Sequence, residues 1–173
     1  MYKVFDYEFE IPKTRNTENL KQGYWGEQWV ANYFKSCGLK CELSNDEFSY
    51  YDNLLDLNNG KISKIQVKTL TRFVKDNCFS ISEGRAKYTI ANTKKCDTLI
   101  IICRTPNHPG IPHDIEFEGK VFIVKNHKKI TLNKNEYIIP SNSKYLIHLG
   151  TLTKDELNQV NSFQTQKTKG NHG

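Results

Sequence analysis

Long apolar runs, paired cysteines and arginine are all scarce in this sequence of 173 residues. No stretch approaches the ~20 consecutive apolar residues that a membrane-spanning helix needs, and no apolar signal region follows Met1. The five cysteines are odd in number and none stand in Cys-x-x-Cys pairs, so we expect reduced thiols. These absences predict an intracellular, cytoplasmic protein with no membrane partner and no disulfide framework.

The charge that is present comes mainly from lysine. Lysine and arginine together number 25 against 19 acidic residues, a net charge of +6, and arginine stands only at positions 15, 72, 85 and 104. An AT-rich coding sequence by itself produces such a bias toward lysine and asparagine. A basic surface nevertheless favours a polyanionic partner, of which nucleic acid is the commonest.

Aromatic residues are plentiful although the apolar content is modest. Nine Tyr, nine Phe and two Trp exclude a disordered chain, while apolar residues make up 37% of the sequence. The length suits one domain, which we place at residues 1–163. The polar segment 164–173 lacks apolar anchors and is expected to be a disordered tail.

Periodicity and turn residues predict both helices and strands. A helix is expected over residues 17–37, with Thr17 as its cap and Gly38 as its stop. The continuous apolar run over residues 98–104 predicts a strand that is covered on both faces. The other expected elements are strands over 4–11, 39–43, 78–81, 121–124, 129–132, 137–139 and 145–149, and helices over 85–95 and 153–163.

Residues 48–57 and 61–70 are β-rich runs joined by Asn58-Asn59-Gly60, which predicts a hairpin. Together with the helices, this order predicts a central mixed β-sheet flanked by helices, an α/β or α+β fold.

The predicted hairpin brings three polar side chains together. Because side chains alternate along a strand, Gln66 and Lys68 share one face. If the turn centres on Asn59, the numbers of facing residues sum to 118, so Asp52 lies opposite Gln66. Opposed side chains have Cβ atoms about 5 Å apart, close enough to share one cation. Asp56 falls nearer the turn and stays outside this group.

These groups suit the hydrolysis of a phosphodiester. Mg²⁺ prefers oxygen ligands, and the Asp52 carboxylate, the Gln66 amide oxygen and the backbone carbonyl of Val67 are candidates. Mn²⁺ accepts the same donors and is expected to substitute. Such a metal polarises the phosphate and lowers the pKa of a bound water. Lys68 can orient that water and offset the charge that builds on the phosphate.

Glu27 is the fourth candidate. On the predicted helix it belongs to the inward stripe with Val30 and Ala31, where a carboxylate needs a partner. Gly23 and Gly26 allow this helix to lie close to the sheet. Glu27 would supply the negative charge that the neutral Gln66 does not, as a metal ligand and catalytic residue.

The segments GYWGEQWVANYFKSCGL and YDNLLDL…KIQVKT together resemble the PD-(D/E)XK nuclease superfamily. The pattern of that superfamily is a helix with Glu, a strand with Asp, and (D/E)XK on the paired strand. The likeness covers about residues 22–104. Here the acidic position holds Gln66, a form that is similar to homing endonucleases of bacterial and phage introns and to some resolvase-like and restriction-type nucleases. By this resemblance Glu27, Asp52, Gln66 and Lys68 form the active site.

The resemblance implies a restriction-endonuclease-like core over about residues 17–104, with extra strands for DNA recognition over 105–163. It implies a Mg²⁺-dependent endonuclease that hydrolyses double-stranded DNA at a specific site, foremost a homing endonuclease, in the cytoplasm of a bacterial or phage-infected cell. A chain this small that cuts both strands normally works as a symmetric homo-oligomer, a dimer or tetramer. A restriction enzyme, a junction resolvase and a repair nuclease share this chemistry and stay open. The neutral Gln66 also leaves open a DNA-binding protein that has lost catalysis.

Lysines gather where acidic residues are missing. Residues 57–75 and 119–135 contain no Asp or Glu. Lysines spread in this way suit phosphate contacts, which position a protein on DNA without reading its sequence. A solvated face accounts equally for any single lysine. The candidate DNA contacts are Lys64, Arg72, Arg85, Lys87, Tyr88, Lys125, Lys128 and Lys129.

Overall fold

In the computed structural model of this protein, the structure describes residues 1–45, 50–70, 78–82, 93–104, 117–129, 132–133, 136–140 and 144–164. The strands are β1 (Tyr2–Val4), β2 (Tyr7–Phe9), β3 (Lys40–Leu43), β4 (Asn53–Asp56), β5 (Ile62–Leu70), β6 (Cys78–Ser82), β7 (Thr98–Cys103), β8 (Lys120–Val124), β9 (Leu132–Asn133), β10 (Glu136–Pro140) and β11 (Leu146–Thr151). The helices are α1 (Glu18–Ser36), the 3₁₀ helix η2 (His127–Lys129) and α3 (Lys154–Asn161).

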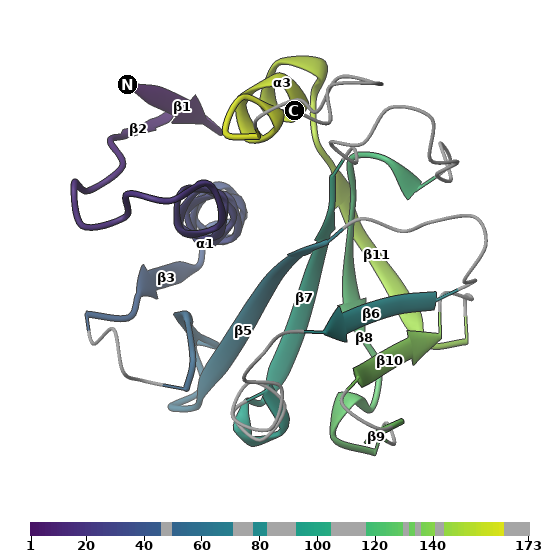
Figure 1. Ribbon diagram of the computed structural model, residues 1–173. Helices are drawn as coiled ribbons and strands as arrows, with labels where there is room; N and C mark the ends of the chain where they lie inside the picture. Colours follow the sequence, from purple (N-terminus) through teal and green to yellow (C-terminus); the bar gives the residue numbers. More distant parts are fainter. Residues whose placement is uncertain are drawn as a thin grey trace, which may run out of the picture.

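The core is a six-stranded sheet with the strand order β11-β8-β7-β5-β4-β3. Smaller sheets of order β1-β2 and β6-β10-β9 accompany it. Figure 1 shows α1 lying beside β3, β4 and β5, with α3 near β1 and β2. The pair β5–β7 is parallel and the other neighbours in the large sheet are antiparallel, which confirms the predicted mixed sheet and the α+β class.

Helix α1 begins and ends at the residues that the sequence marks. Thr17 Oγ1 accepts a hydrogen bond from the first-turn backbone at 3.2 Å, and Gly38 has a φ of +84° just beyond the last turn. Trp25 and Trp29 are fully buried, and Trp25 Nε1 donates to Gln159 Oε1 of α3 at 3.0 Å. The prediction of a helix over residues 17–37 is confirmed, and its docking fixes where Glu27 lies.

Strands β4 and β5 form the predicted hairpin in the predicted register. Pairs run from Asn53 opposite Ile65 to Asp56 opposite Ile62, so the numbers of facing residues sum to 118. Gly60 takes a φ of +81° in the turn, a conformation that costs glycine little. Pairing ends at Asn53, because β4 is shorter than the predicted run 48–57. Among the described residues, none pairs with β5 on this side beyond Asn53, which leaves an open edge beside residues 50–52.

Strand β7 is the buried strand that its apolar run predicts. It lies between β5 and β8, and residues 99–102 are fully buried. Parallel strands require a crossover connection. Residues 71–97 supply that connection between β5 and β7, and β6 within it pairs with β10 in another sheet.

Besides the shorter β4, two further predicted strands are wrong in part. Residues 4–11 do not form one strand, because Phe5 and Asp6 have φ of +51° and +65° and turn the chain back between β1 and β2. Residues 129–132 are not one strand either, since Lys129 belongs to η2, whereas Leu132 belongs to β9 and residues 130–131 lie outside the described residues. In residues 4–11 the apolar alternation continues on both sides of the turn at Phe5 and Asp6, so the sequence pattern does not reveal this turn.

The C-terminal helix is confirmed. Thr153 and Glu156 form a capping box, with Thr153 Oγ1 accepting from the Glu156 N–H at 3.1 Å and Glu156 Oε1 accepting from the Thr153 N–H at 2.8 Å. Of the predicted helix 85–95, residues 93–95 are helical and the rest lies outside the described residues. The predicted tail lies outside them beyond Gln164. Within the described ranges, no helix is long and apolar enough to span a bilayer.

Gly26 is the position at which α1 comes closest to the sheet. A Cβ at Gly26 would lie 2.9 Å from Thr69 Oγ1 and 3.3 Å from Ile102 Cδ1. We expect Gly26→Ala to lower the free energy of unfolding by about 1–3 kcal/mol, measured by urea denaturation, because the added methyl pushes the helix off β5.

Gly23→Ala is the matched control on the same helix. Its added Cβ would meet only Glu27 Oε2 at 3.9 Å, an ordinary contact, and alanine is the better helix former by up to ~1 kcal/mol. Gly23→Ala is therefore expected to be neutral or stabilising. Equal stabilities of the two variants would contradict the close approach of α1 at Gly26.

Candidate active site at the open edge of β5

Asp52 lies at the open edge of β5, one residue before β4 begins. Its backbone N–H donates at 2.8 Å to the carbonyl of Ile65, the residue that Asn53 also faces, so Asp52 stays bonded to β5 just beyond the last regular pair. Its Oδ2 accepts from the Val67 N–H at 2.8 Å and from Gln66 Nε2 at 2.7 Å. The carboxylate thus occupies the place of a missing strand partner, and Asp52 meets Gln66 as the register predicts.

Glu27 reaches this edge from helix α1. Its side chain is almost fully buried, and its Oε2 lies 3.6 Å from Arg15 Nη1. Arg15 precedes the helix and also places its guanidinium 5.6 Å from the ring centre of Tyr24. The inward position predicted for Glu27 is confirmed, and the partner that a buried carboxylate needs is an arginine outside the predicted site.

Two faces of β5 contribute to the site. Gly26 packs near the side chain of Val67, so α1 covers the face that carries Val67. Because side chains alternate, Gln66 and Lys68 point to the opposite face. Glu27 and Lys68 therefore approach the Asp52 carboxylate from opposite sides of the sheet.

Burial and charge act together on the two carboxylates. Burial raises the pKa of Glu27 to about 8, the charge of Asp52 adds to this rise, and Arg15 and Lys68 oppose it. Burial also raises the pKa of Asp52, while the Val67 N–H, Lys68 and Arg15 lower it. A bound cation would favour the charged form of both groups and relieve this cost.

The donor set fits a hard cation rather than zinc. Within the part of the chain that the structure describes, no group of three or more His, Cys, Asp or Glu side chains could hold a metal. Two carboxylates, an amide oxygen and a backbone carbonyl with waters match Mg²⁺, which keeps several waters. In a strand the N–H and C=O of one residue point to the same neighbour, so the Val67 carbonyl shares the open edge with the N–H that bonds Asp52.

Gln66 holds its amide in one defined orientation. Its nitrogen faces Asp52 Oδ2, while its oxygen lies 4.0 Å from Cys96 Sγ. Metal ligation through the amide oxygen therefore requires a half-turn of the amide group. Burial raises the pKa of the Cys96 thiol to about 12, so this thiol stays protonated and donates to the carbonyl of Tyr50 at 3.1 Å.

Asn53 is a site residue that sequence reasoning missed. It is fully buried, and its Nδ2 donates to the backbone carbonyl of Glu27 at 2.9 Å. This bond joins the first residue of β4 to the turn of α1 that carries the glutamate. Its position directly after Asp52 was the one signal in the sequence, and the partner, 26 residues away, was not readable there.

The structure describes three of the predicted DNA contacts with their side chains. Lys64 Nζ lies 2.8 Å from the hydroxyl of Tyr50, and Lys125 and Lys128 are exposed. Lys129 stands in η2, and its side chain is outside the description. The other predicted contacts lie outside the described residues: Arg72, Arg85, Lys87 and Tyr88.

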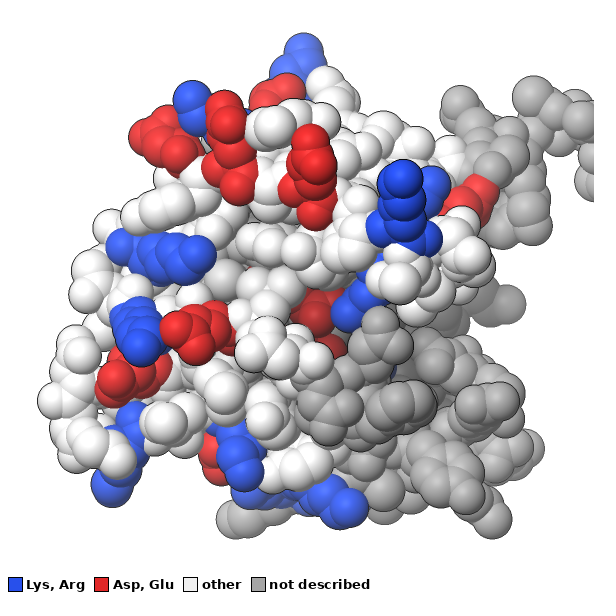
Figure 2. All heavy atoms as spheres, turned by 90° about the vertical axis from the view of Figure 1, so that its left-hand side faces the viewer, with Lys and Arg blue, Asp and Glu red and all other residues white. Residues whose placement is uncertain are grey.

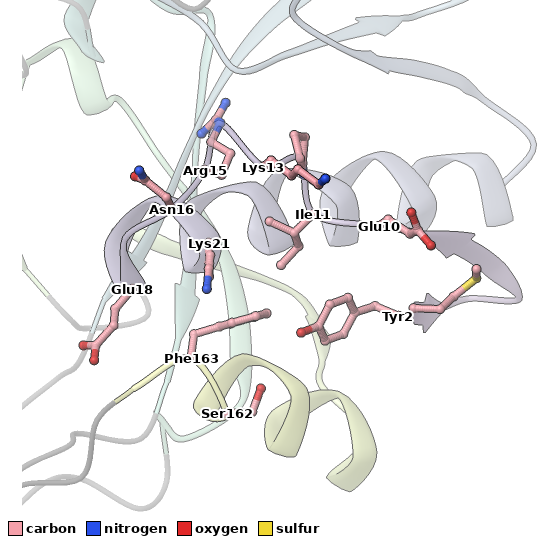
Figure 3. Close-up of a pocket in the computed structure, with 12 residues that line it drawn as sticks. Tyr2, Glu10, Ile11, Lys13, Arg15, Asn16, Glu18, Lys21, Ser162 and Phe163 are labelled. Carbon is pink, nitrogen blue, oxygen red and sulfur yellow. The ribbon is translucent and has the colours of Figure 1, made fainter.

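A cavity of about 820 Å³ adjoins the site on the side of the N-terminal segment. Figure 3 shows its walls, formed by Tyr2 of β1, the segment between β2 and α1, the start of α1, and Ser162 and Phe163 just after α3. Arg15 is common to the cavity and to the ion pair with Glu27. Because the lining carries both signs of charge, it favours no ligand of one sign. The charged side chains that line it are Glu10, Lys13, Arg15, Glu18 and Lys21.

The face seen in Figure 2 also intermixes acidic and basic side chains. Acidic atoms lie recessed near the centre of this view, bordered by a basic side chain. Among the residues described on this face, the basic side chains form no continuous band.

The raised pKa of Glu27 predicts how stability changes with pH. In the folded protein Glu27 keeps its proton between its ordinary pKa of 4.5 and about 8, a range in which the unfolded chain has lost it. Stability should therefore fall as the pH rises through this window. Denaturant unfolding in EDTA at several pH values measures the slope, and Glu27→Gln is expected to flatten much of it.

Glu42→Gln provides the control for that slope. Glu42 is an exposed glutamate on β3 that pairs with Lys40 at 3.6 Å, so its replacement should leave the pH dependence intact. A slope that survives Glu27→Gln unchanged would show that the burial of this carboxylate does not govern it.

Comparisons with known proteins add little to this geometry. No protein-family model and no curated protein matches the chain. Among solved structures, the chain is similar to a bacterial homing endonuclease, I-Ssp6803I, with 15% sequence identity and a TM-score of 0.35. That likeness covers 77% of this chain and 78% of the other. A likeness at this TM-score carries no inference about function.

Proposed function

We propose that this chain is a Mg²⁺-dependent nuclease of the PD-(D/E)XK type that hydrolyses phosphodiester bonds of DNA. One observation carries the proposal. At the open edge of β5, the buried Glu27 and the partly buried Asp52, two carboxylates with raised pKa values, lie within electrostatic reach of Lys68. Desolvated carboxylates without full compensation often mark functional sites, and this pair provides oxygen ligands near an ammonium group.

Each residue has a proposed role. Bound Mg²⁺ supplies Lewis acidity and a water of lowered pKa. Asp52 and Glu27 would hold the metal, together with the Gln66 amide oxygen and the Val67 carbonyl. The Val67 N–H fixes the Asp52 carboxylate at 2.8 Å, so it needs little reorganisation during the reaction. Lys68 would orient the attacking water and offset the negative charge on the phosphate.

The finer points of the proposal concern the biological role. We propose site-specific cutting of double-stranded DNA, and foremost a homing endonuclease, on the resemblance of the QVK segment. Cutting both strands needs two such sites, which a symmetric homodimer would supply. Mn²⁺ should replace Mg²⁺, because both metals accept carboxylate and carbonyl oxygens.

A second candidate is a DNA-binding protein that has the site but no activity. The observation that favours it is the orientation of Gln66, whose nitrogen donates to Asp52 where an acidic residue would add a metal-binding charge. The two candidates differ in whether the site takes up a metal and cuts DNA.

The test compares Asp52→Asn and Lys68→Ala with the wild type on plasmid DNA. Cleavage by the wild type should require Mg²⁺ or Mn²⁺ and stop with EDTA. Each variant should reduce the cleavage rate by roughly 100-fold or more, because each removes a group that acts directly on the transition state or its metal. If the wild type binds DNA but does not cut it with any divalent metal, the proposed nuclease activity is contradicted and the second candidate is favoured.

Asp56→Asn is the matched control, since Asp56 lies at the far end of β4 from Asp52 and its carboxylate accepts the N–H of Asn58 in the turn at 2.9 Å. Its cleavage rate should stay near that of the wild type. A second readout does not depend on activity, because a metal that binds only the folded state raises the melting temperature. Mg²⁺ should raise it for the wild type and for Asp56→Asn but not for Asp52→Asn.

A further inference from the structure

Two tyrosines directly before Asp52 form a surface with lysines from neighbouring elements. The rings of Tyr50 and Tyr51 meet edge to face, with centres 5.3 Å apart. Lys64 Nζ lies 5.3 and 5.6 Å from the two ring centres, and Lys95 Nζ lies 5.9 Å from that of Tyr50. We call Tyr50, Tyr51, Lys64 and Lys95 the tyrosine–lysine surface.

This surface is held on the central sheet. The Cys96 thiol donates to the carbonyl of Tyr50 at 3.1 Å, which fixes the tyrosine backbone beside the start of β7. The backbone N–H of Lys64 donates to Asp97 Oδ2 at 2.9 Å, and the Asp97 N–H donates back to the Lys64 carbonyl at 2.9 Å. His127 Nε2 lies 2.8 Å from the Cys96 carbonyl and ties η2 to the same place. Such preorganisation lowers the entropy cost of binding a ligand.

The lysines of this surface keep their charge available. The ion pairs among the described residues join Lys3 to Asp6, Arg15 to Glu27 and Lys40 to Glu42. Neither Lys64 nor Lys95 takes part in them. The carboxylate of Asp97 accepts the backbone N–H of Lys64 and forms no ion pair with the ammonium group. Among the residues that the structure describes, no carboxylate therefore lies within ion-pair distance of either ammonium group beside these rings.

The combination of ammonium groups and aromatic rings suits unpaired nucleic acid. Ammonium groups bind phosphates, and aromatic rings stack on bases whose faces are uncovered. In an intact duplex the base faces are covered by stacking, so the rings would find no partner there. Lys64 stands four residues before Lys68 on the same face of β5, roughly 13 Å away at about 3.3 Å per residue. That length equals about four nucleotides of duplex rise.

We propose that the substrate is DNA with unpaired nucleotides within about four positions of the cleavage point, held by the tyrosine–lysine surface. The inference rests on the proposed nuclease function, because it names the substrate class of that site. Mismatched, bulged, flapped or locally melted duplexes belong to this class, and an uninterrupted duplex does not.

The experiment measures binding apart from cleavage. Fluorescence anisotropy in EDTA gives the affinity of the full chain for an uninterrupted duplex, the same duplex with a short internal unpaired segment, and the single strand. The wild type should bind the two DNAs with unpaired bases at least about 5-fold more tightly, because one stacked base contributes that much or more. The double variant Tyr50→Leu/Tyr51→Leu should lose this preference.

Two variants separate stacking from a structural role. Tyr50→Phe/Tyr51→Phe keeps both rings and should keep the preference, even if the leucine variant folds poorly by circular dichroism. Tyr7→Leu/Lys35→Met is the control, because it removes a similar pair elsewhere, in which Lys35 Nζ lies 5.3 Å from the Tyr7 ring centre. This variant should keep the wild-type preference for DNA with unpaired bases. The logarithm of the binding constant falls linearly with the logarithm of the salt concentration, and Lys64→Met and Lys95→Met should each make this slope shallower by roughly 0.7–0.9.

The outcomes separate this inference from the proposed function. Equal affinity of the wild type for all three DNAs, or a preference that survives in a folded leucine variant, overturns the inference. Cleavage of the same DNAs is then measured with Mg²⁺. Cleavage without a binding preference would support the proposed nuclease activity but contradict the binding of unpaired nucleotides by the tyrosine–lysine surface. A binding preference without cleavage in any metal would support that binding but contradict the nuclease activity.

Discussion

The candidate site depends on one constraint, the point at which β4 stops pairing with β5. Because pairing ends at Asn53, the N–H of Val67 faces an open edge, and the Asp52 carboxylate bonds it at 2.8 Å. A β4 strand longer by two residues would satisfy that N–H with backbone and turn the carboxylate away. The short strand thus creates a place where a charged side chain completes the sheet and still faces Gln66.

Bringing α1 to this edge places a second carboxylate in a poorly hydrated site. Gly26 allows the close approach, and Asn53 bonds the Glu27 carbonyl, so the glutamate is held where burial raises its pKa to about 8. Arg15 and Lys68 offset only part of that cost. Such a site is less stable than an apolar core of the same volume would be, a pattern that functional sites commonly show.

The surroundings extend the site along the sheet. Tyr50 and Tyr51 precede Asp52, and Lys64 precedes Gln66, so the hairpin that assembles the carboxylate and the amide also aligns rings and ammonium groups beside them. Cys96, two residues before β7, donates to the carbonyl of Tyr50 and lies near the Gln66 amide oxygen. Substrate binding and the proposed chemistry would therefore share one rigid support built from central strands.

Local sequence determined the helix limits, the turn and the hairpin register, because caps, left-handed turn residues and the alternation of side chains act over a few residues. It therefore placed Asp52 opposite Gln66, but it misread residues 4–11, where the alternation runs through a two-residue turn. Only the tertiary structure decided the rest. The partnership of Glu27 with Arg15, the bond from Asn53 and the raised carboxylate pKa values arise from packing between distant segments, and a pattern of neighbouring residues contains no information on such distances or burial.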